Sequence, residues 1–184
     1  MSQSREHQPR IRPATPDDVP ILLGFIRALA EYERMLNEVV TTEAGLHDGL
    51  FGPCRVAESA IAEWEGSPAG FALFFHNFST FAGKPGIYLE DLFVLPELRG
   101  KGIGRALLTY LAKLTRDRGC VRLEWSVLDW NEPAIGFYRA LGAVAMVGPV
   151  AALAAWRLRD ATFRGRGLVE PLILLPLVLP PVVT

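Results

Sequence analysis

The sequence predicts a single α/β (α+β) domain on a mixed central sheet, in which an antiparallel meander is followed by a β-α-β unit. Three extended apolar runs with short connections lie between residues 55 and 95, which is typical of a meander. An amphipathic helical pattern then leads to another extended run, and such a crossover sets the flanking strands parallel. With 184 residues, 50% of them hydrophobic, the chain is long enough for one domain with a substantial core.

The first predicted elements are a short strand and two helices. The strand is expected at residues 11–14. Thr15 is an N-cap, Pro16 suits the first helical position, and apolar residues recur at helical spacing to about residue 34. Thr42 begins a second, shorter helix.

The meander and the β-α-β unit follow. We expect strands at residues 55–64, 69–78 and 86–95, then a helix from Ile103 to a stop signal at Gly119. A strand is expected at 121–128, and a last helix begins at the cap Asn131 and ends at Gly142. The predicted order is strand, two helices, three strands, helix, strand, helix.

Both ends of the chain differ in composition from this domain, which we expect to span residues 10–146. Residues 1–9 are polar, predict a flexible N-terminus and contain no secretory signal, so a cytoplasmic location is expected. Residues 147–184 predict an atypical C-terminal extension. Its aliphatic stretch at 168–183 is too short and too rich in proline for a membrane-spanning helix.

Charge and cysteine content argue against several classes of function. Nineteen Lys and Arg against 20 Asp and Glu leave no basic excess for a general nucleic-acid binder. Cys54 and Cys120 show no metal-ligand spacing with each other or with the three histidines, so no metal is expected. We expect both cysteines to be small apolar core residues.

The segment 99–105 predicts a binding loop for an anion. Its glycines stand at alternate positions and let successive backbone N–H groups converge on one ligand. The helix behind them adds its unpaired N-terminal donors. The glycines are Gly100, Gly102 and Gly104, and the neighbouring cations are Arg99, Lys101 and Arg105. Three cations at one loop favour a pyrophosphate over a neutral ligand.

Two better-known phosphate loops fit this segment less well. A P-loop requires Ser or Thr directly after Gly-Lys, where this chain has Gly102. The dinucleotide fingerprint requires a third glycine at the place of Arg105, although Glu124 lies at the distance of a ribose-binding acid. A nicotinamide-dependent oxidoreductase therefore stays open as an alternative.

Four further segments accompany the loop in a characteristic order. They are Ile-Arg-Pro-Ala-Thr at 11–15, Leu-Ala-Glu-Tyr-Glu at 29–33, Tyr-Leu-Glu-Asp-Leu-Phe-Val at 88–94, and the stretch 130–138. Together with the loop they resemble the GNAT superfamily of acetyl-coenzyme-A-dependent N-acetyltransferases, and most closely its spermidine/spermine and thialysine branch. The resemblance covers about residues 10–146. It implies the GNAT fold and an enzyme that uses acetyl-coenzyme A (acetyl-CoA) as co-substrate.

The resemblance also implies the reaction and the residues that serve it. Acetyl would pass to a primary amine of a small cationic substrate, a polyamine, diamine or lysine-like amine, by direct attack in a ternary complex. For acetyl-CoA, the implied residues are Leu92, Phe93, Val94, Arg99, Gly100, Lys101, Gly102, Ile103, Gly104, Arg105, Asn131, Glu132, Pro133, Ala134 and Tyr138. For the amine, they are Tyr32, Glu33, Glu90, Glu124, Trp125 and Ser126.

The chemistry of the reaction suggests two catalytic residues. An alkyl amine has a pKa near ~10.4, so on the order of one molecule in a thousand is the free base at neutral pH. Glu90, through water, is the candidate proton acceptor, and Tyr138 is the candidate donor to the leaving thiolate. A backbone N–H within 92–94 could stabilise the oxyanion. Acidic residues on the substrate side, Asp91 among them, would favour a cationic amine.

The chain departs from that branch after residue 143. The branch closes with a final strand that is often exchanged within a homodimer, and Trp156 to Leu158 is a candidate for this strand after an insertion. The departure leaves the dimer open, as it does the alternative of a non-catalytic module that only binds acyl-CoA. The expected partner is a small-molecule amine, with no nucleic acid and no membrane.

Overall fold

The computed structural model describes residues 8–142, 144–147 and 152–156. In chain order the elements are β1 (Arg10–Pro13), the 3-10 turn η1 (Pro16–Asp18), α1 (Val19–Tyr32), η2 (Leu36–Glu38), α2 (Glu43–Phe51), β2 (Glu58–Trp64), β3 (Ser67–Ser79), β4 (Lys84–Val94), η3 (Pro96–Leu98), α3 (Ile103–Asp117), β5 (Leu123–Val127), α4 (Glu132–Ala140), β6 (Val144–Val147) and β7 (Ala152–Trp156).

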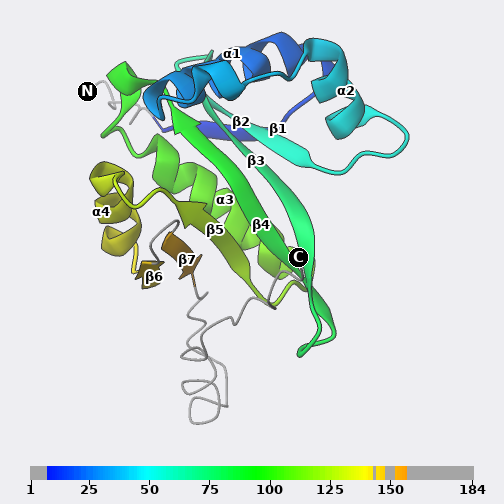
Figure 1. Cartoon of the computed structure of the whole chain (residues 1–184), viewed down its shortest axis with the longest axis vertical. Helices are drawn as coiled ribbons and strands as arrows, with labels where there is room; N and C mark the ends of the chain where they lie inside the picture. Colours follow the sequence, from blue (N-terminus) through cyan, green and yellow to red (C-terminus); the bar gives the residue numbers. More distant parts are fainter. Residues whose placement is uncertain (1–7, 143, 148–151, 157–184) are drawn as a thin grey trace, which may run out of the picture.

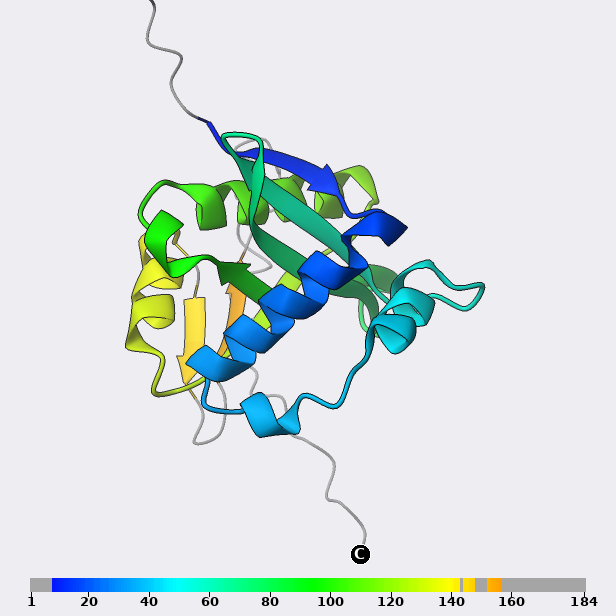
Figure 2. The same ribbon diagram turned by 90° about the horizontal axis from the view of Figure 1, so that it is seen from above.

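The strands form one sheet in the order β1-β2-β3-β4-β5-β7-β6 (Figure 1). Neighbours from β1 to β4 are antiparallel, β4 and β5 are parallel, and β7 is antiparallel to both β5 and β6. The crossover helix α3 packs on the face of the sheet opposite to α1 and α2 (Figure 2). The predicted mixed sheet, with its meander followed by a β-α-β unit, is confirmed.

The structure differs from the sequence prediction mainly at the C-terminal side. The predicted element order ended with the last helix and the predicted domain at residue 146, with only Trp156 to Leu158 as a candidate for a later strand, but the sheet also contains β6 and β7. The sequence of β7, Ala-Leu-Ala-Ala-Trp, has little strand propensity, so its pairing with β5 determines its conformation. Residues 1–7 of the expected flexible N-terminus and 157–184 of the expected extension lie outside the described residues.

Two smaller expectations also need correction. Cys54 is exposed and is not a core residue, whereas Cys120 is half-buried. The first helix begins as the 3-10 turn η1, and α-helical geometry starts only at Val19. Thr15 still forms the predicted cap, as part of a capping box with Asp18.

A charged network fixes the beginning of α1 against the sheet. Asp18 accepts hydrogen bonds from the Thr15 N–H at 2.7 Å and from both terminal nitrogens of Arg12 at 2.7 and 2.8 Å. The Nε of Arg12 donates to Glu63 of β2 at 2.6 Å. The Arg12 guanidinium lowers the pKa of Asp18 to about 2. These contacts determine where α1 begins, and therefore where its last residue, Tyr32, is placed.

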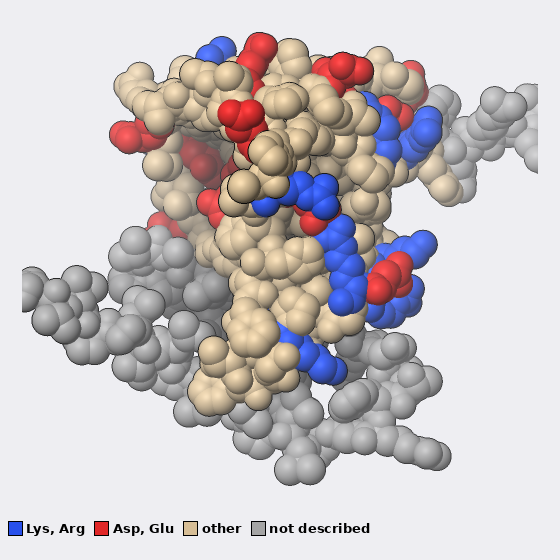
Figure 3. Space-filling view, turned by 90° about the vertical axis from the view of Figure 1, so that its right-hand side faces the viewer, with Lys and Arg blue, Asp and Glu red and all other residues tan. Residues whose placement is uncertain are grey.

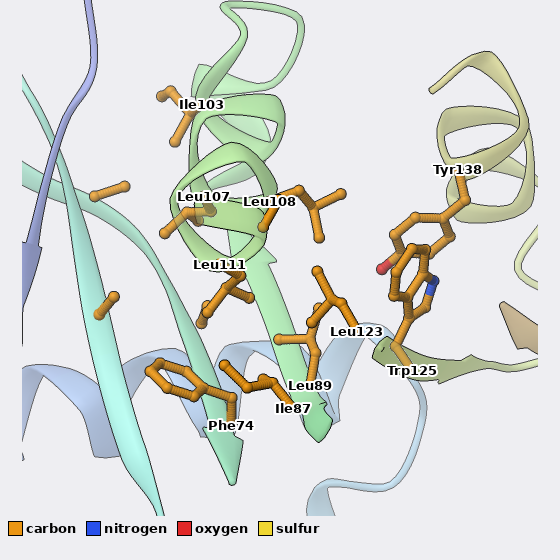
Figure 4. Close-up of a cluster of buried hydrophobic side chains, with 14 of the residues drawn as sticks. Phe74, Ile87, Leu89, Ile103, Leu107, Leu108, Leu111, Leu123, Trp125 and Tyr138 are labelled. Atoms are coloured by element: carbon orange, nitrogen blue, oxygen red, sulfur yellow. The ribbon is translucent and has the colours of Figure 1, made fainter. Parts of the chain in front are cut away.

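Separate hydrophobic clusters cover the two faces of the sheet. On one face, Leu107 and Leu111 of α3 pack into a cluster with residues of β2 to β5 (Figure 4). On the other face, Phe25 of α1 lies 5.9 Å from the ring of Phe71 and 5.8 Å from that of Phe93. The sheet therefore forms the middle layer of three.

A β-bulge in β4 changes which face its side chains reach. Two consecutive residues of β3 lie opposite Leu89 and Asp91, so Glu90 is an extra residue on β4. Leu89 belongs to the cluster under α3, and Phe93 belongs to the cluster under α1. Without the extra residue, both side chains would point to the same face, because side chains alternate along a strand.

β4 and β5 separate directly after this bulge. Their pairing runs from Ile87–Leu123 to Leu89–Trp125 and then ends. β4 continues to Val94 along β3, while β5 continues to Val127 along β7. A gap between the carboxyl ends of the two strands results.

The described surface carries charges of both signs. Acidic and basic side chains lie next to each other on the face shown in Figure 3, with no continuous basic surface on that face. Within the described ranges, no helix has the length and apolar character needed to cross a bilayer.

The contact between β3 and β4 at Gly70 generates a stability prediction. A Cβ at this position would fall on the Phe93 carbonyl oxygen, a backbone atom that cannot move without disturbing the strand pair. We expect Gly70→Ala to lower the free energy of unfolding in urea by about 2 kcal/mol. The matched control is Gly24→Ala on the exposed side of α1, where a Cβ meets open space. The free energy of unfolding of Gly24→Ala should rise by up to about 1 kcal/mol. A Gly70→Ala protein of wild-type stability would contradict the proposed clash with Phe93.

Candidate active site

A cavity of about 800 Å³ opens where β4 and β5 separate. Its walls are the end of α1, the second half of β4, the loop before α3, the end of β5 and the beginning of α4. Its volume lies within the range of small-molecule and cofactor sites. All the segments to which the sequence assigned site residues therefore meet at one place.

All but three of the predicted site residues line this cavity; the exceptions are Lys101, Glu124 and Glu132. The Nζ of Lys101 lies 5.2 Å from the ring centroid of Trp64. Glu124 accepts a hydrogen bond from the Asn77 amide at 2.6 Å, and Glu132 is an exposed residue at the start of α4. For Glu124, the alternation of side chains along β5 directs it to the face opposite to that of its neighbour Trp125, which lines the cavity.

The glycine loop has the geometry of an anion site. Gly100 and Gly102 have φ angles of 80° and 81°, in the left-handed region that favours glycine. A Cβ on either would meet no atom within 4 Å, so the space beside the loop is open. Gly102 is the N-cap of α3, whose first N–H groups have no partners within the helix. Arg99 and Arg105 line the same part of the cavity.

Gly104, the third glycine, serves the packing of two helices. A Cβ at this position would lie 3.2 Å from the Cζ of Phe137 on α4. A side chain here would press on the Phe137 ring, so glycine lets α4 lie close to the first turn of α3 without a shift of that ring. The alternating glycines of the loop thus have two different causes, one conformational and one steric.

Backbone groups of β4 face the cavity on the side that β5 has left. The Leu95 N–H donates to the Ala69 carbonyl of β3 at 3.0 Å. Because successive N–H groups along a strand alternate in direction, those of Val94 and Leu92 point away from β3. On that side the Val94 carbonyl accepts a hydrogen bond from the Nε of Arg99 at 3.2 Å. The N–H of Leu92 is placed to donate to a ligand in the cavity.

Tyr138 reaches the cavity from α4 and is almost completely enclosed. Its side chain is 7% exposed, and its ring lies 5.0 Å from the ring of Trp125 (Figure 4). Burial, with a smaller contribution from Glu33, raises the pKa of the phenol well above its ordinary value. Tyr138 therefore stays protonated at neutral pH and can donate a hydrogen bond.

Carboxylates form another part of the cavity wall. Glu33, Glu90 and Asp91 all line it. Burial, together with the smaller effects of the charges of Glu90 and Glu33, raises the pKa of Asp91 to about 6. Burial also raises the pKa of Glu33. Ser126 also lines the cavity, with its hydroxyl 2.6 Å from that of Tyr88. This side of the cavity suits a cation.

Seven further lining residues were not among the cofactor and amine residues that the resemblance implies. They are Leu29, Leu89, Asp91, Leu98, Val127, Leu128 and Phe137. Six are apolar, and their pattern cannot be distinguished from that of ordinary core positions. Asp91 was expected only as one of several acidic residues on the substrate side, because the bulge that determines how deeply each carboxylate is enclosed could not be predicted.

Metal-binding geometry is not found in the described part of the chain. No group of three or more His, Cys, Asp or Glu side chains among these residues is arranged to hold a metal ion.

Comparison with known proteins connects this site to acyl transfer. A profile described as "Acetyltransferase (GNAT) family" matches residues 22–143. The chain is 42% identical over 141 residues to thialysine N-epsilon-acetyltransferase of Bos taurus, covering 72% of this chain and 82% of that protein. It is 34% identical over 179 residues to L-ornithine N5-acetyltransferase of Arabidopsis thaliana, covering 73% and 78%.

Solved structures show the same fold. An integron cassette protein from the mobile metagenome of V. cholerae superimposes with a TM-score of 0.63 at 27% identity, over 75% of this chain and 86% of that one. An aminoglycoside acetyltransferase from an uncultured soil sample gives a TM-score of 0.66 at 20% identity, over 76% and 92%.

The enclosure of Asp91 predicts a pH-dependent cost to stability. Its pKa is about 6 in the folded protein and ~3.9 when unfolded. Folding therefore favours the protonated form, so the cost is absent below pH ~4, grows up to about pH 6 and is constant above. Asp91→Asn should raise the free energy of unfolding at pH 8 by roughly 2 to 3 kcal/mol, and by little at pH 4.

Urea denaturation of wild type and variant at both pH values measures this difference. Asp48→Asn is the control, because the Asp48 side chain is 83% exposed on α2, and it should change stability little at either pH. An equal effect of Asp91→Asn at pH 4 and pH 8 would show that its carboxylate is not desolvated.

Proposed function

Because the chain belongs to the acetyltransferase (GNAT) family, it is an enzyme that transfers acetyl to an amine, and we propose that its acceptor is a small cationic primary amine. The class comprises polyamines, diamines and lysine-like amino acids. The observation that carries this proposal is the group of carboxylates Glu33, Glu90 and Asp91 in the same cavity as the glycine loop. Carboxylates attract an ammonium group before it loses its proton. The relatives named for thialysine and L-ornithine, both cationic amines, support the same class.

The family uses acetyl-CoA as co-substrate, and the residues present fit it. Acetyl-CoA supplies an acetyl group activated as a thioester. In our proposal, the N–H groups at Gly102 and the start of α3, with Arg99 and Arg105, hold the pyrophosphate. Leu92 donates its N–H to the thioester oxygen and stabilises the negative charge that develops there.

The proton of the amine needs an acceptor at the acidic side of the cavity. We assign this role to Glu90, through water, together with Asp91. A carboxylate with a pKa of about 6 is a stronger base than an ordinary one, yet it is still mostly ionised at neutral pH. The two carboxylates are neighbours in sequence, and the charge of Glu90 contributes to the raised pKa of Asp91.

Tyr138 is assigned to the leaving sulfur. A phenol of ordinary pKa, ~10, gives its proton to a thiolate near ~8.5 only uphill, by about 2 kcal/mol. Burial raises the pKa of Tyr138 above that of an ordinary phenol. Tyr138 therefore acts by donating a hydrogen bond to the developing thiolate, and complete transfer of its proton is not required.

The position of these groups supports direct attack in a ternary complex. The anion loop, the β4 backbone and the carboxylates belong to one cavity of about 800 Å³. An amine at Glu90 and Asp91 and an acetyl group at Leu92 are neighbours in this proposal, so no acetylated enzyme needs to form. The nicotinamide alternative loses its support, since Glu124, its ribose-binding acid, lies outside the cavity.

A homodimer belongs to the same proposal. Phe78 and Phe81, in β3 and in the turn to β4, are 62% and 99% exposed. Large aromatic side chains at such exposure are typical of a surface that another protein covers. We propose a second copy of this chain as the partner.

Removal of the Tyr138 hydroxyl tests the assigned acid. Tyr138→Phe should lower kcat about 100-fold, because the developing thiolate loses its donor. The affinity for coenzyme A should change less than about twofold, because the pyrophosphate contacts remain. Stopped assays of thiol release measure kcat, and calorimetry measures affinity. A variant that turns over at the wild-type rate would remove Tyr138 from the mechanism.

A panel of amines tests the proposed substrate class. Thialysine, L-ornithine and spermidine carry a second ammonium group, and propylamine does not. We expect kcat/KM for the first three to exceed that for propylamine by about tenfold or more, the equivalent of ~1.4 kcal/mol from one additional charge contact. Glu33→Gln should reduce this ratio and leave propylamine unaffected. Equal values of kcat/KM across the panel would refute cation selectivity, and no thiol release with any amine would refute the proposed acceptor class.

A further inference from the structure

We propose that Tyr32 is a positioning residue that couples the acetyl-CoA side of the cavity to α4, the helix that carries Tyr138. The inference rests on the proposed function, since it takes Arg99 as a ligand of the pyrophosphate. Tyr32 is the last residue of α1 and lines the cavity. It contacts Arg99 through its ring and α4 through its hydroxyl.

The hydroxyl of Tyr32 holds the beginning of α4. It donates a hydrogen bond to the Oδ1 of Asn131 at 3.0 Å. The same oxygen accepts the Ala134 N–H at 3.2 Å, as the N-cap of α4. Asn131 is only 7% exposed, so water has little access to replace the Tyr32 bond. One buried oxygen therefore connects the end of α1 to the first turn of α4.

Other contacts hold α4 from a different direction. Phe137 packs on Gly104 of α3, and Tyr138 packs on Trp125 of β5. Tyr138 is seven residues, or about two turns, beyond Asn131, so the two lie on nearly the same face of the helix. The bond from Tyr32 fixes the free end of that face, and through it the direction of the Tyr138 side chain.

The ring of Tyr32 packs against the guanidinium group of Arg99. The guanidinium carbon lies 4.8 Å from the ring centroid, and the Nε donates to the Val94 carbonyl at 3.2 Å. An anion bound by Arg99 would hold the guanidinium in place against the ring. The ring then restricts the hydroxyl, and the hydroxyl restricts Asn131. Occupancy of the anion loop thus reduces the motion of α4.

Amide hydrogen exchange with coenzyme A bound tests this coupling without turnover. Tyr32→Phe removes the hydroxyl and keeps the ring under Arg99. We expect the amides of 134–140 to exchange about fivefold faster than in wild type, the loss of one neutral hydrogen bond. The amides of α3 should be unchanged, and coenzyme A affinity by calorimetry should stay within about twofold. Unchanged exchange at 134–140 would overturn the proposal.

Matched variants separate the coupling from a general loosening of the protein. Tyr110→Phe removes a half-buried hydroxyl on α3 and should leave α4 unchanged. Asn131→Ser keeps a capping oxygen on a shorter side chain, so it should loosen α4 as much as Tyr32→Phe. Combining Tyr32→Phe with Asn131→Ser should then add nothing. Asn131→Asp keeps acceptor oxygens at the same reach and should exchange like wild type. Full additivity in the double variant would refute the link through Asn131.

Kinetics distinguish this inference from the proposed function. In Tyr32→Phe we expect kcat to fall about fivefold while the KM for acetyl-CoA stays unchanged, because Tyr138 is less well placed. If α4 exchanges faster as expected but no amine of the panel releases thiol, the coupling stands and the proposed acceptor class fails. If thialysine is acetylated normally by Tyr32→Phe and α4 exchange is unchanged, the coupling fails and the function stands.

Discussion

The site depends on the end of the pairing between β4 and β5. The backbone N–H and C=O groups of a buried strand edge need hydrogen-bond partners. Beyond Leu89, β4 and β5 meet this need in different ways. β5 pairs with β7, while β4 keeps β3 on one side and presents its other side to the cavity. The gap therefore has a wall of oriented backbone donors. It is closed by α4, whose place is set by close packing on α3. The cavity is thus a result of the sheet topology and does not require an unusual loop.

The bulge at Glu90 determines the chemistry of this gap. It places Asp91 and Phe93 on the α1 side of the sheet, and Leu92 on the α3 side. Glu90 and Asp91 thereby lie within two residues of the Leu92 N–H donor on the same strand. Arg99 and Arg105 line the same cavity near the N-terminus of α3. A chain with a net charge of −1 thus brings arginines suited to an anion and carboxylates suited to a cation into one cavity.

Periodicity, capping signals and the glycine spacing were sufficient to predict the meander, the crossover helix and the anion loop, whereas most candidate site residues were implied by the resemblance to the GNAT superfamily. Features that depend on a partner in space could not be predicted. The sequence Leu-Glu-Asp at 89–91 does not predict a bulge, because the extra residue is defined only by its pairing with the opposite strand, β3. The alanine-rich β7 is a strand because β5 offers it an edge. Lys101 was expected at the loop because it stands between glycines, but its ammonium group lies over Trp64.

The packing of Phe137 on Gly104 has a consequence for how such a chain can diverge. The two positions are 33 residues apart in sequence and touch in the fold. A mutation at one of them therefore changes which residues are tolerated at the other. A larger residue at 104 is accessible only after the aromatic ring at 137 has become smaller, because the reverse order passes through an overpacked intermediate. The order of mutations, and not only their identity, would be constrained in any lineage that alters this helix contact.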